Sequence, residues 1–177
     1  MSDALQLLRE QHAEASALFM KLERISDATT CEHIFRSLDV KLRDHTVIEE
    51  ELFYPAFRDR AARENGKSEI DEAEHEHAEV KAVLGEIEKL SPTDYTFKTK
   101  IGELKRAVEH HVREEEQKIL PQAQRLFSQS ELDEMGLKMV KLMSIHSPVY
   151  QIGGTQVQTA ARDTLHRIGD FISKIGS

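Results

Sequence analysis

Apolar residues recur at alternating spacings of three and four along four successive segments of the chain. Such spacing keeps side chains on one face of an α-helix, so each segment predicts a helix with one buried and one solvated face. The first two stripes consist of Leu5, Leu8, His12, Ala15, Phe19 and Leu22, and of Phe35, Leu38, Leu42, His45, Glu49 and Phe53. The other two consist of Ile70, Ala73, His77, Val80, Leu84 and Ile87, and of Ile101, Leu104, Val108, His111, Glu115 and Ile119. Every stripe therefore contains a histidine, and two contain a glutamate.

Capping motifs predict where these helices begin. A Ser or Thr side chain can accept a hydrogen bond from a free N–H group of the first helical turn, and proline is tolerated at the first helical position. The first helix is expected over residues 3–24, and a turn over 63–67, which include Asn65-Gly66, precedes the third. The expected starts of the second, third and fourth helices are Thr29-x-x-Glu32, Ser68-x-x-Asp71 and Ser91-Pro92.

Further helices are expected beyond Pro121. Ser128-x-x-Glu131 is a capping box that opens a fifth helix running to about residue 143. Gly153-Gly154 then breaks the chain before an amphipathic stretch over residues 157–175. We therefore expect one helical domain over residues 1–125 and a C-terminal helical extension, 126–177, packed on it.

A repeated motif is the most specific feature of the sequence. His45-x-x-x-Glu49 and His111-x-x-x-Glu115 lie 66 residues apart, and each is followed by a proline ten residues after its histidine. Upstream, His12 and His77 each begin the tripeptide His-Ala-Glu, 65 residues apart. The chain therefore predicts two helical hairpins, each with one lone histidine and one His-x-x-x-Glu pair. The first of the two prolines, Pro55, should kink or loosen its helix rather than end the fold.

The ligand types in this repeat favour a metal site. Residues four apart share one helix face, and counting from the turns puts the two histidines of each hairpin at nearly the same level. Four imidazoles and two carboxylates facing one interior form the ligand set of a dinuclear site. Burying two carboxylates in a helical core without a cation would cost several kcal/mol each. Nitrogen and oxygen donors without thiolate suit iron, manganese or zinc, and two carboxylates able to bridge favour a pair of ions.

Other residues near the motif are assigned lesser roles. A single histidine on an apolar stripe is more often a hydrogen-bonded core residue than a ligand, and the assignment depends on four of them recurring together. Among the flanking carboxylates, Glu50 and Glu116 are candidates for a ring around the ligands. Tyr54 falls off the metal-facing stripe and is expected to pack rather than to react, while Phe53 and Ile119 should form an apolar wall. The histidines expected to lie outside the site are His33, His75, His110, His146 and His166.

Composition narrows the class of protein. Charged residues make up 32% and hydrophobic residues 39% of the 177 residues, without tryptophan, which fits a mostly helical soluble protein. The net charge of −8 argues against nucleic acid or an anionic membrane as a partner. Apolar runs stay short of the roughly 20 residues of a membrane span. A single cysteine, Cys31, has no internal disulfide partner, and we expect a cytoplasmic protein. The oligomeric state is open.

These residues resemble the hemerythrin-like (HHE cation-binding) family. The resemblance rests on His12, His77 and the two His-x-x-x-Glu motifs with their glutamate-rich approach to Pro55 and Pro121, and it covers about residues 3–125. It implies an all-α, antiparallel up-down four-helix bundle around a non-heme di-iron centre with a bridging oxo or hydroxo group. The metal ligands that it implies are His12 and His45 for one iron, His77 and His111 for the other, and Glu49 and Glu115 bridging both.

Two departures from the oxygen-carrying members bear on function. The carriers have a fifth histidine one turn before the third-helix ligand, where this chain has Ala73, and they replace the glutamate of the fourth helix by an aspartate one position later. The chain is instead similar to the four-histidine branch. We expect a protein that binds or senses oxygen, peroxide or nitric oxide. The alternatives are a peroxide- or nitric-oxide-consuming oxidoreductase and an iron donor for repair of iron centres. A ferritin-like oxidase would need Glu-x-x-His on two helices; Glu74-x-x-His77 supplies one credible copy, and His111 lacks its partner because Val108 occupies that position.

Overall fold

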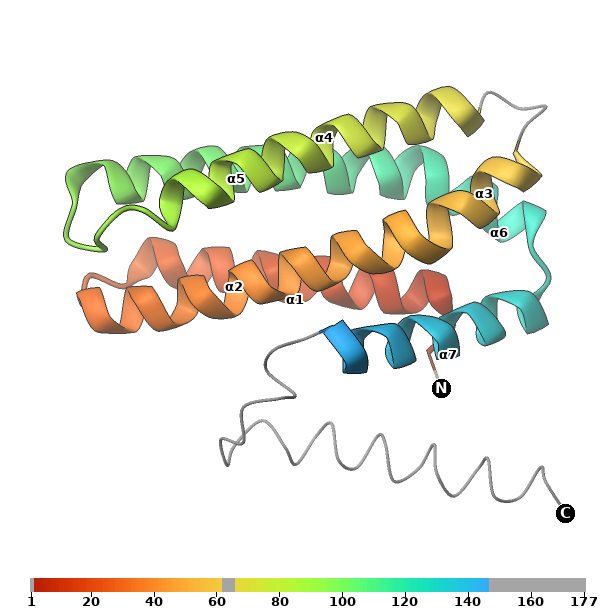
Figure 1. The fold of residues 1–177 in the computed structure, drawn as a ribbon, viewed down its shortest axis with the longest axis horizontal. Helices are drawn as coiled ribbons and strands as arrows, with labels where there is room; N and C mark the ends of the chain where they lie inside the picture. The colour runs from red at the N-terminus through yellow and green to blue at the C-terminus, as the bar shows by residue number, and fades with distance from the viewer. Residues whose placement is uncertain (1, 62–65, 147–177) are drawn as a thin grey trace, which may run out of the picture. The chain divides into compact units, whose positions relative to one another are not determined.

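The structure, a computed structural model, describes residues 2–61 and 66–146. Every regular element within those ranges is a helix, which confirms the all-α class. The four long helices are α1 (Ala4–Arg24), α2 (Ala28–Ile48), α4 (Gly66–Ile87) and α5 (Tyr95–Glu114). They form two hairpins, α1 with α2 and α4 with α5, as the repeat predicts (Figure 1).

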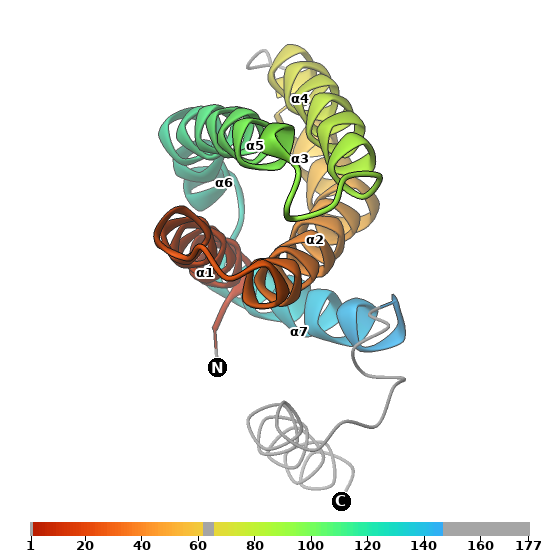
Figure 2. The ribbon, with the colours of Figure 1, turned by 90° about the vertical axis from the view of Figure 1, so that its left-hand side faces the viewer.

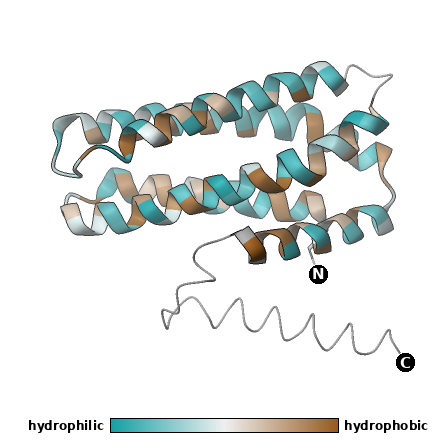
Figure 3. Cartoon of the chain, viewed as in Figure 1, coloured by the Kyte–Doolittle hydropathy of each residue, from teal (hydrophilic) through white to brown (hydrophobic). Residues whose placement is uncertain are grey.

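The two hairpins pack into an antiparallel bundle. Seen along the bundle, the four long helices surround a common axis (Figure 2), and successive helices run in opposite directions (Figure 1). Polar and hydrophobic residues alternate along each helix, as an amphipathic pattern requires (Figure 3). The antiparallel up-down bundle implied by the family resemblance is therefore confirmed.

Two apolar clusters occupy opposite ends of the bundle interior. One lies toward the short α1–α2 and α4–α5 connections and includes Phe19, Phe35, Leu84 and Leu104. The other lies beyond the histidines and is built from Leu5, Leu8, Ile48, Phe53, Tyr54, Phe57, Ile70 and Leu120, among others. The histidines and glutamates of the repeat occupy the level between these clusters. Their side chains are therefore shielded from water at both ends of the bundle.

Aspartates begin three of the long helices. Asp3 caps α1, and Asp27 caps α2 by accepting a hydrogen bond from the Thr30 N–H at 2.8 Å. Asp94 caps α5 in the same way, through the Thr96 N–H at 2.9 Å. The starts expected at Thr29 and Ser91 are therefore wrong by two or three residues, because aspartate side chains nearby compete as caps.

The third helix also begins earlier than its motif suggested. α4 starts at Gly66, so Ser68 lies inside it and Gly66 belongs to the helix rather than to a turn. A Cβ atom at Gly66 would lie 2.2 Å from the Ala61 Cβ, so the close approach of the two segments requires glycine. Residues 62–65, which hold most of the expected turn, are outside the described residues.

Widened turns begin at Glu49 and Glu115. The π-helical turns η1 (Glu49–Phe53) and η2 (Glu115–Ile119) lead directly into the short helices α3 (Tyr54–Arg60) and α6 (Leu120–Leu126). Each short helix carries a proline in its first turn. Proline has no N–H to donate to the carbonyl four residues earlier, and its ring crowds that carbonyl, so the helix opens locally. The loosening expected at Pro55 thus takes the form of a π turn.

A fifth long helix, α7 (Gln129–His146), packs against α1 and α2. It begins at the expected capping box, where Ser128 and Glu131 hydrogen-bond each other through backbone and side chain at 2.8 Å. The domain boundary at residue 125 stays a prediction. The break at Gly153-Gly154 and the helix expected over 157–175 lie outside the described residues. None of the described helices has the length and apolar character needed to cross a membrane.

Candidate metal centre

The six residues predicted as metal ligands converge at one level of the bundle. Each comes from a different turn of a long helix or from the first residue of a π turn, and all six are buried, with both glutamates fully so. They are His12, His45, Glu49, His77, His111 and Glu115. Their role as metal ligands stays a prediction, but the convergence that it requires is present.

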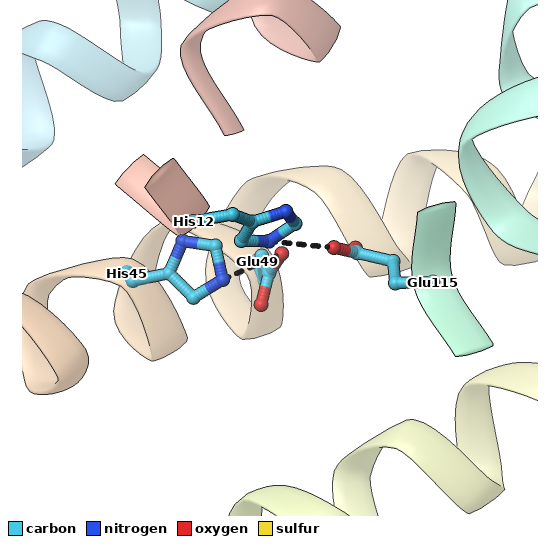
Figure 4. Close-up of side chains that lie close together, drawn as sticks. All are labelled: His12, His45, Glu49 and Glu115. Atoms are coloured by element: carbon cyan, nitrogen blue, oxygen red, sulfur yellow. Dashed lines mark ion pairs between the residues drawn. The ribbon is translucent and has the colours of Figure 1, made fainter. Parts of the chain in front are cut away.

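The first donor group consists of His12, His45, Glu49 and Glu115 (Figure 4). One ligand atom from each residue lies within 4.8 Å of the others. His12 Nε2 is 3.1 Å from Glu115 Oε2, and His45 Nε2 is 3.2 Å from Glu49 Oε1. Figure 4 shows these side chains pointing toward one another from opposite sides of the bundle. The group therefore offers two imidazole nitrogens and two carboxylates to one point.

The second donor group consists of His77, His111 and, again, Glu49. His77 Nε2 is 3.1 Å and His111 Nε2 is 3.8 Å from Glu49 Oε2, the oxygen that does not face His45. Glu49 thus turns one carboxylate oxygen toward each group. The two donor groups therefore share one carboxylate.

Buried polar atoms without hydrogen bonds mark the same place. His12 Nε2, His45 Nε2, Glu49 Oε1 and both oxygens of Glu115 have no hydrogen-bond partner among the described residues. The nitrogen–oxygen pairs lie within ion-pair distance, but their geometry is not that of a hydrogen bond. A buried polar atom left in this state is costly. A cation placed between these atoms would satisfy them together, so the residues fit a metal.

The two carboxylates also differ electrostatically when no ion is bound. Burial raises the pKa of Glu49, but the imidazoles of His45, His111 and His77 outweigh burial and hold that pKa well below its usual value. For Glu115, burial and the negative charge on Glu49 raise the pKa to about 7. Two buried carboxylates this close together therefore do not ionise equally without a cation.

A ring of polar side chains holds the outer nitrogen, Nδ1, of every ligand histidine. Glu116 and Glu50 belong to this ring, as the sequence suggested. The sequence pattern did not indicate its other members, Gln11 and Glu76. Both lie about 100° around their helices from the buried stripe, at positions where the periodicity predicts exposure to solvent. The available signal is that each directly precedes a ligand histidine.

Tyr54 lies in the site, contrary to its expected role as a packing residue away from the metal-facing side. It is fully buried, its ring stacks on His77 at 5.5 Å between centroids, and its hydroxyl is 3.4 Å from Glu49 Oε2. The π turn is the reason, since one extra residue in the turn rotates everything after it by about 100°. Phe53 and Ile119 are buried as expected.

The remaining histidines do not join the donor groups. His75 has an exposed side chain and pairs with Glu79 on its own helix. His110 is also exposed, although its Nε2 lies 3.1 Å from Glu76 Oε1, and His33 is exposed. The side chain of His146 and all of His166 lie outside the described residues.

A small cavity opens beside the histidines on the side away from the carboxylates. Its volume is about 20 Å³, and the four ligand histidines line it together with small and aliphatic side chains. That volume is enough for roughly one water-sized molecule. A small molecule can therefore lie against all four imidazoles, whereas an organic substrate does not fit without rearrangement.

The chain is similar in sequence to known proteins. The sequence profile of the Hemerythrin HHE cation binding domain matches residues 3–123. A DNA nickase of Nostoc sp. is 30% identical over 110 residues, which are 62% of this chain and 30% of that protein. An uncharacterized hemerythrin-like protein of Schizosaccharomyces pombe is 25% identical over 122 residues, which are 69% of this chain and 60% of that protein. The chain therefore spans less than two thirds of either relative.

A solved structure also matches the fold. The crystal structure of a hemerythrin HHE cation binding domain-containing protein from Mycobacterium kansasii superposes with a TM-score of 0.74 at 25% sequence identity. The match covers 94% of this chain and 99% of that one.

Proposed function

Because the chain belongs to the hemerythrin HHE cation-binding family, we propose that it is a non-heme di-iron protein that binds or senses oxygen, peroxide or nitric oxide. One observation carries the proposal: two groups of buried donors share Glu49. Manganese or zinc are the alternative metals, because both accept the same nitrogen and oxygen donors. We expect the protein to act in the cytoplasm.

The ligand roles follow from which atoms face each other. His12 and His45 would hold one ion and His77 and His111 the other, and Glu49, which turns one oxygen toward each group, would be shared by both. The family resemblance would make Glu115 a second bridge, but in the structure it belongs only to the donor group of His12 and His45, with its Oε2 3.1 Å from His12 Nε2. Two histidines and two carboxylates leave each ion short of six ligands, so a small molecule can complete the coordination.

The size of the ligand is limited by the cavity beside the histidines. A space of about 20 Å³ suits a ligand of about the size of a diatomic molecule, and its lining combines the four histidines and aliphatic side chains with the polar Gln11, Lys41 and Thr46. The net charge of −8 does not favour nucleic acid as the ligand, and the name of the Nostoc relative describes a protein of which this chain spans 30%.

An enzyme that consumes peroxide or nitric oxide is the second candidate, and Tyr54 is the observation that favours it. Its hydroxyl lies 3.4 Å from the shared carboxylate, where a phenol can exchange a proton with Glu49. Steady-state consumption of peroxide by the iron-loaded protein separates the candidates. Sustained turnover that falls in the Tyr54→Phe variant supports an enzyme, whereas stoichiometric binding without turnover supports a sensor.

The proposal is tested by loading the protein with iron under anaerobic conditions. We expect two iron ions per chain, a charge-transfer band after exposure to oxygen and magnetic coupling between the two ions. Optical spectra with oxygen, peroxide and nitric oxide then identify the ligand. A single zinc ion per chain after iron-replete expression would contradict the proposal.

A further inference from the structure

The residue after each bridging glutamate supports a histidine of the opposite hairpin. Glu116 lies 2.8 Å from Nδ1 of His12, and Glu50 lies 3.0 Å from Nδ1 of His77. A histidine bound to a metal through Nε2 carries its proton on Nδ1, so both carboxylates accept a hydrogen bond from the ring. The two contacts are equivalent under the exchange of hairpins.

The residue before each lone histidine supports the second histidine of its own hairpin, and here the equivalence fails. Gln11 Oε1 lies 2.8 Å from Nδ1 of His45, whereas Glu76 Oε2 lies 3.0 Å from Nδ1 of His111. One acceptor is a neutral amide and the other is a carboxylate. The amide is held in the orientation required, because Gln11 Nε2 donates to the Met143 sulfur at 3.0 Å.

The chemical difference acts on the strength of the ligand. A carboxylate that accepts the Nδ1 proton makes the imidazole a more basic donor through Nε2 than a neutral amide does. The side chain of Glu76 is only 10% exposed, so solvent screens its charge weakly.

The other two outer carboxylates do not cancel this difference. Both oxygens of Glu50 lie 2.9 Å from the Lys81 ammonium, which offsets its charge. The side chain of Glu116 is 40% exposed and is screened by solvent. Glu76 is therefore the least solvent-exposed carboxylate of the ring, and it hydrogen-bonds His111 of the second donor group.

We propose that Gln11 and Glu76 make the two metal positions unequal. Glu76 makes the position at His77 and His111 the tighter one, which fills first, and Gln11 leaves the position at His12 and His45 weaker, so that it fills second. This inference rests on the two-metal centre proposed above. It concerns metal affinity and the order of loading, so activity of the loaded protein is not needed to test it.

The test is an anaerobic titration of the full-length metal-free protein with Fe(II), in competition with a chelating dye. The wild-type protein should bind two ions in two separate steps. Glu76→Gln should weaken the tighter step by about 10- to 100-fold, and Gln11→Glu should tighten the weaker step in the same range. The double variant, with both residues exchanged, should reverse which position fills first.

Histidine variants assign the steps to positions. His12→Ala damages the first position and should retain the tighter step, whereas His77→Ala should retain the weaker one. Circular dichroism checks that each variant folds. Where a histidine variant does not fold, Gln11→Glu and Glu76→Gln keep the test decisive, because each preserves the size of the side chain.

Matched controls distinguish the effect of the hydrogen bond to the histidine ring from the effect of adding or removing a charge nearby. Glu79→Gln removes one charge from an exposed side chain on the same helix, and Ala13→Glu adds one beside His12 on the exposed face of α1. Both should leave the two steps unchanged. Two ions that bind with equal affinity in the wild type, or steps that neither Gln11→Glu nor Glu76→Gln moves, overturn the inference. Fewer than two bound ions would instead overturn the proposed function.

Discussion

The two hairpins carry the same ligand motif in different surroundings. Nine residues after the motif histidine, the first hairpin has Tyr54 and the second has Leu120, and both are fully buried. The phenol reaches Glu49, whereas the leucine leaves both oxygens of Glu115 without a hydrogen bond in the described part of the chain. In addition, α7 packs on the first hairpin, on the side away from α4 and α5 (Figure 2).

This difference shows which features the metal geometry requires and which can vary. The shared features are His-x-x-x-Glu, the π turn that begins at the glutamate, and the proline behind it, and they aim the ligands. The features that differ are contacts made by the outer faces of the ligands or by the residues after the π turn. We infer that these contacts set the properties of each half of the centre without moving its ligands.

The largest effect should come from removing the two carboxylates one at a time. Glu49 belongs to both donor groups, so Glu49→Ala should lose both metal ions and the coupling between them. Glu115 belongs only to the first group, so Glu115→Ala should lose mainly the ion at His12 and His45. Metal analysis of the purified variants measures this. His75→Ala, on the exposed face of α4, is the control and should retain both ions. Equal losses from the two glutamate variants would mean that Glu115 is as central a bridge as Glu49.

The convergence of the four buried histidines was predictable from sequence because the stripe of three-and-four spacing fixes which residues face inward. The repeat at 65 and 66 residues then indicated which inward histidines belong together. Tyr54 was not predictable in this way, since a π turn shifts the helical count after Glu49. Gln11 and Glu76 were not predictable from periodicity either, because their side chains reach back from the polar side of the stripe to a ring edge.

The predicted starts of the helices were wrong for a different reason. At the start of α2, Asp27 and Thr29 are both good capping residues within two positions of each other, and local sequence does not decide between them. The assignment depends on where the bundle needs the first turn.

Removal of the metal should expose the electrostatic imbalance between the hairpins. In the metal-free protein the pKa of Glu115 is raised from 4.5 to about 7, so its protonated form stabilises the fold, and that stability is lost as pH rises through 7. The pKa of His111 is raised from 6.5 to about 10, so its contribution is complete below 6.5 and is lost as pH rises through 10. The pKa of His45 is lowered from 6.5 to about 3, so its neutral ring contributes stability that is complete above pH 6.5 and is lost as the pH falls toward 3.

Thermal unfolding therefore has a defined pH dependence. The melting temperature of the metal-free protein should lie several degrees below that of the loaded protein and should fall between pH 7 and pH 9. In the loaded protein both groups stay deprotonated or metal-bound, so the decline should be smaller. Parallel melting curves for the two forms across this range would show that the core does not depend on the site.

A smaller effect should separate the hairpin covered by α7 from the other. A Cβ atom at Gly136 of α7 would lie 2.9 Å from the Ser2 carbonyl oxygen and 3.0 Å from the Ala4 nitrogen, and backbone atoms cannot easily yield. Overpacking costs about 1–3 kcal/mol, and alanine regains about 1 kcal/mol of helix propensity. Gly136→Ala should therefore lower the free energy of unfolding by about 1 kcal/mol while both metals stay bound.

The matched substitution in the second hairpin is Gly85→Ala. A Cβ atom there meets nothing within 4 Å, so alanine should stabilise α4 by about 0.5–1 kcal/mol. Chemical denaturation of both variants measures the contrast. If both variants change the free energy of unfolding in the same direction, α7 does not pack against the start of α1 as closely as the 2.9 Å approach at Gly136 requires.

The smallest effect should come from Tyr54→Phe, which makes the surroundings of Glu49 resemble those of Glu115 beside Leu120. The ring and its stacking on His77 remain, and only a long hydrogen bond of 3.4 Å is lost. A net contribution at the low end of about 0.5–1.5 kcal/mol is expected for such a contact in the metal-free protein. Both metals should stay bound, because the carboxylate is held mainly by the histidines around it. Denaturation of metal-free protein and metal analysis of loaded protein test the two statements separately. Loss of an ion in this variant would show that the hydroxyl positions Glu49, and the difference between Tyr54 and Leu120 would then decide which carboxylate bridges.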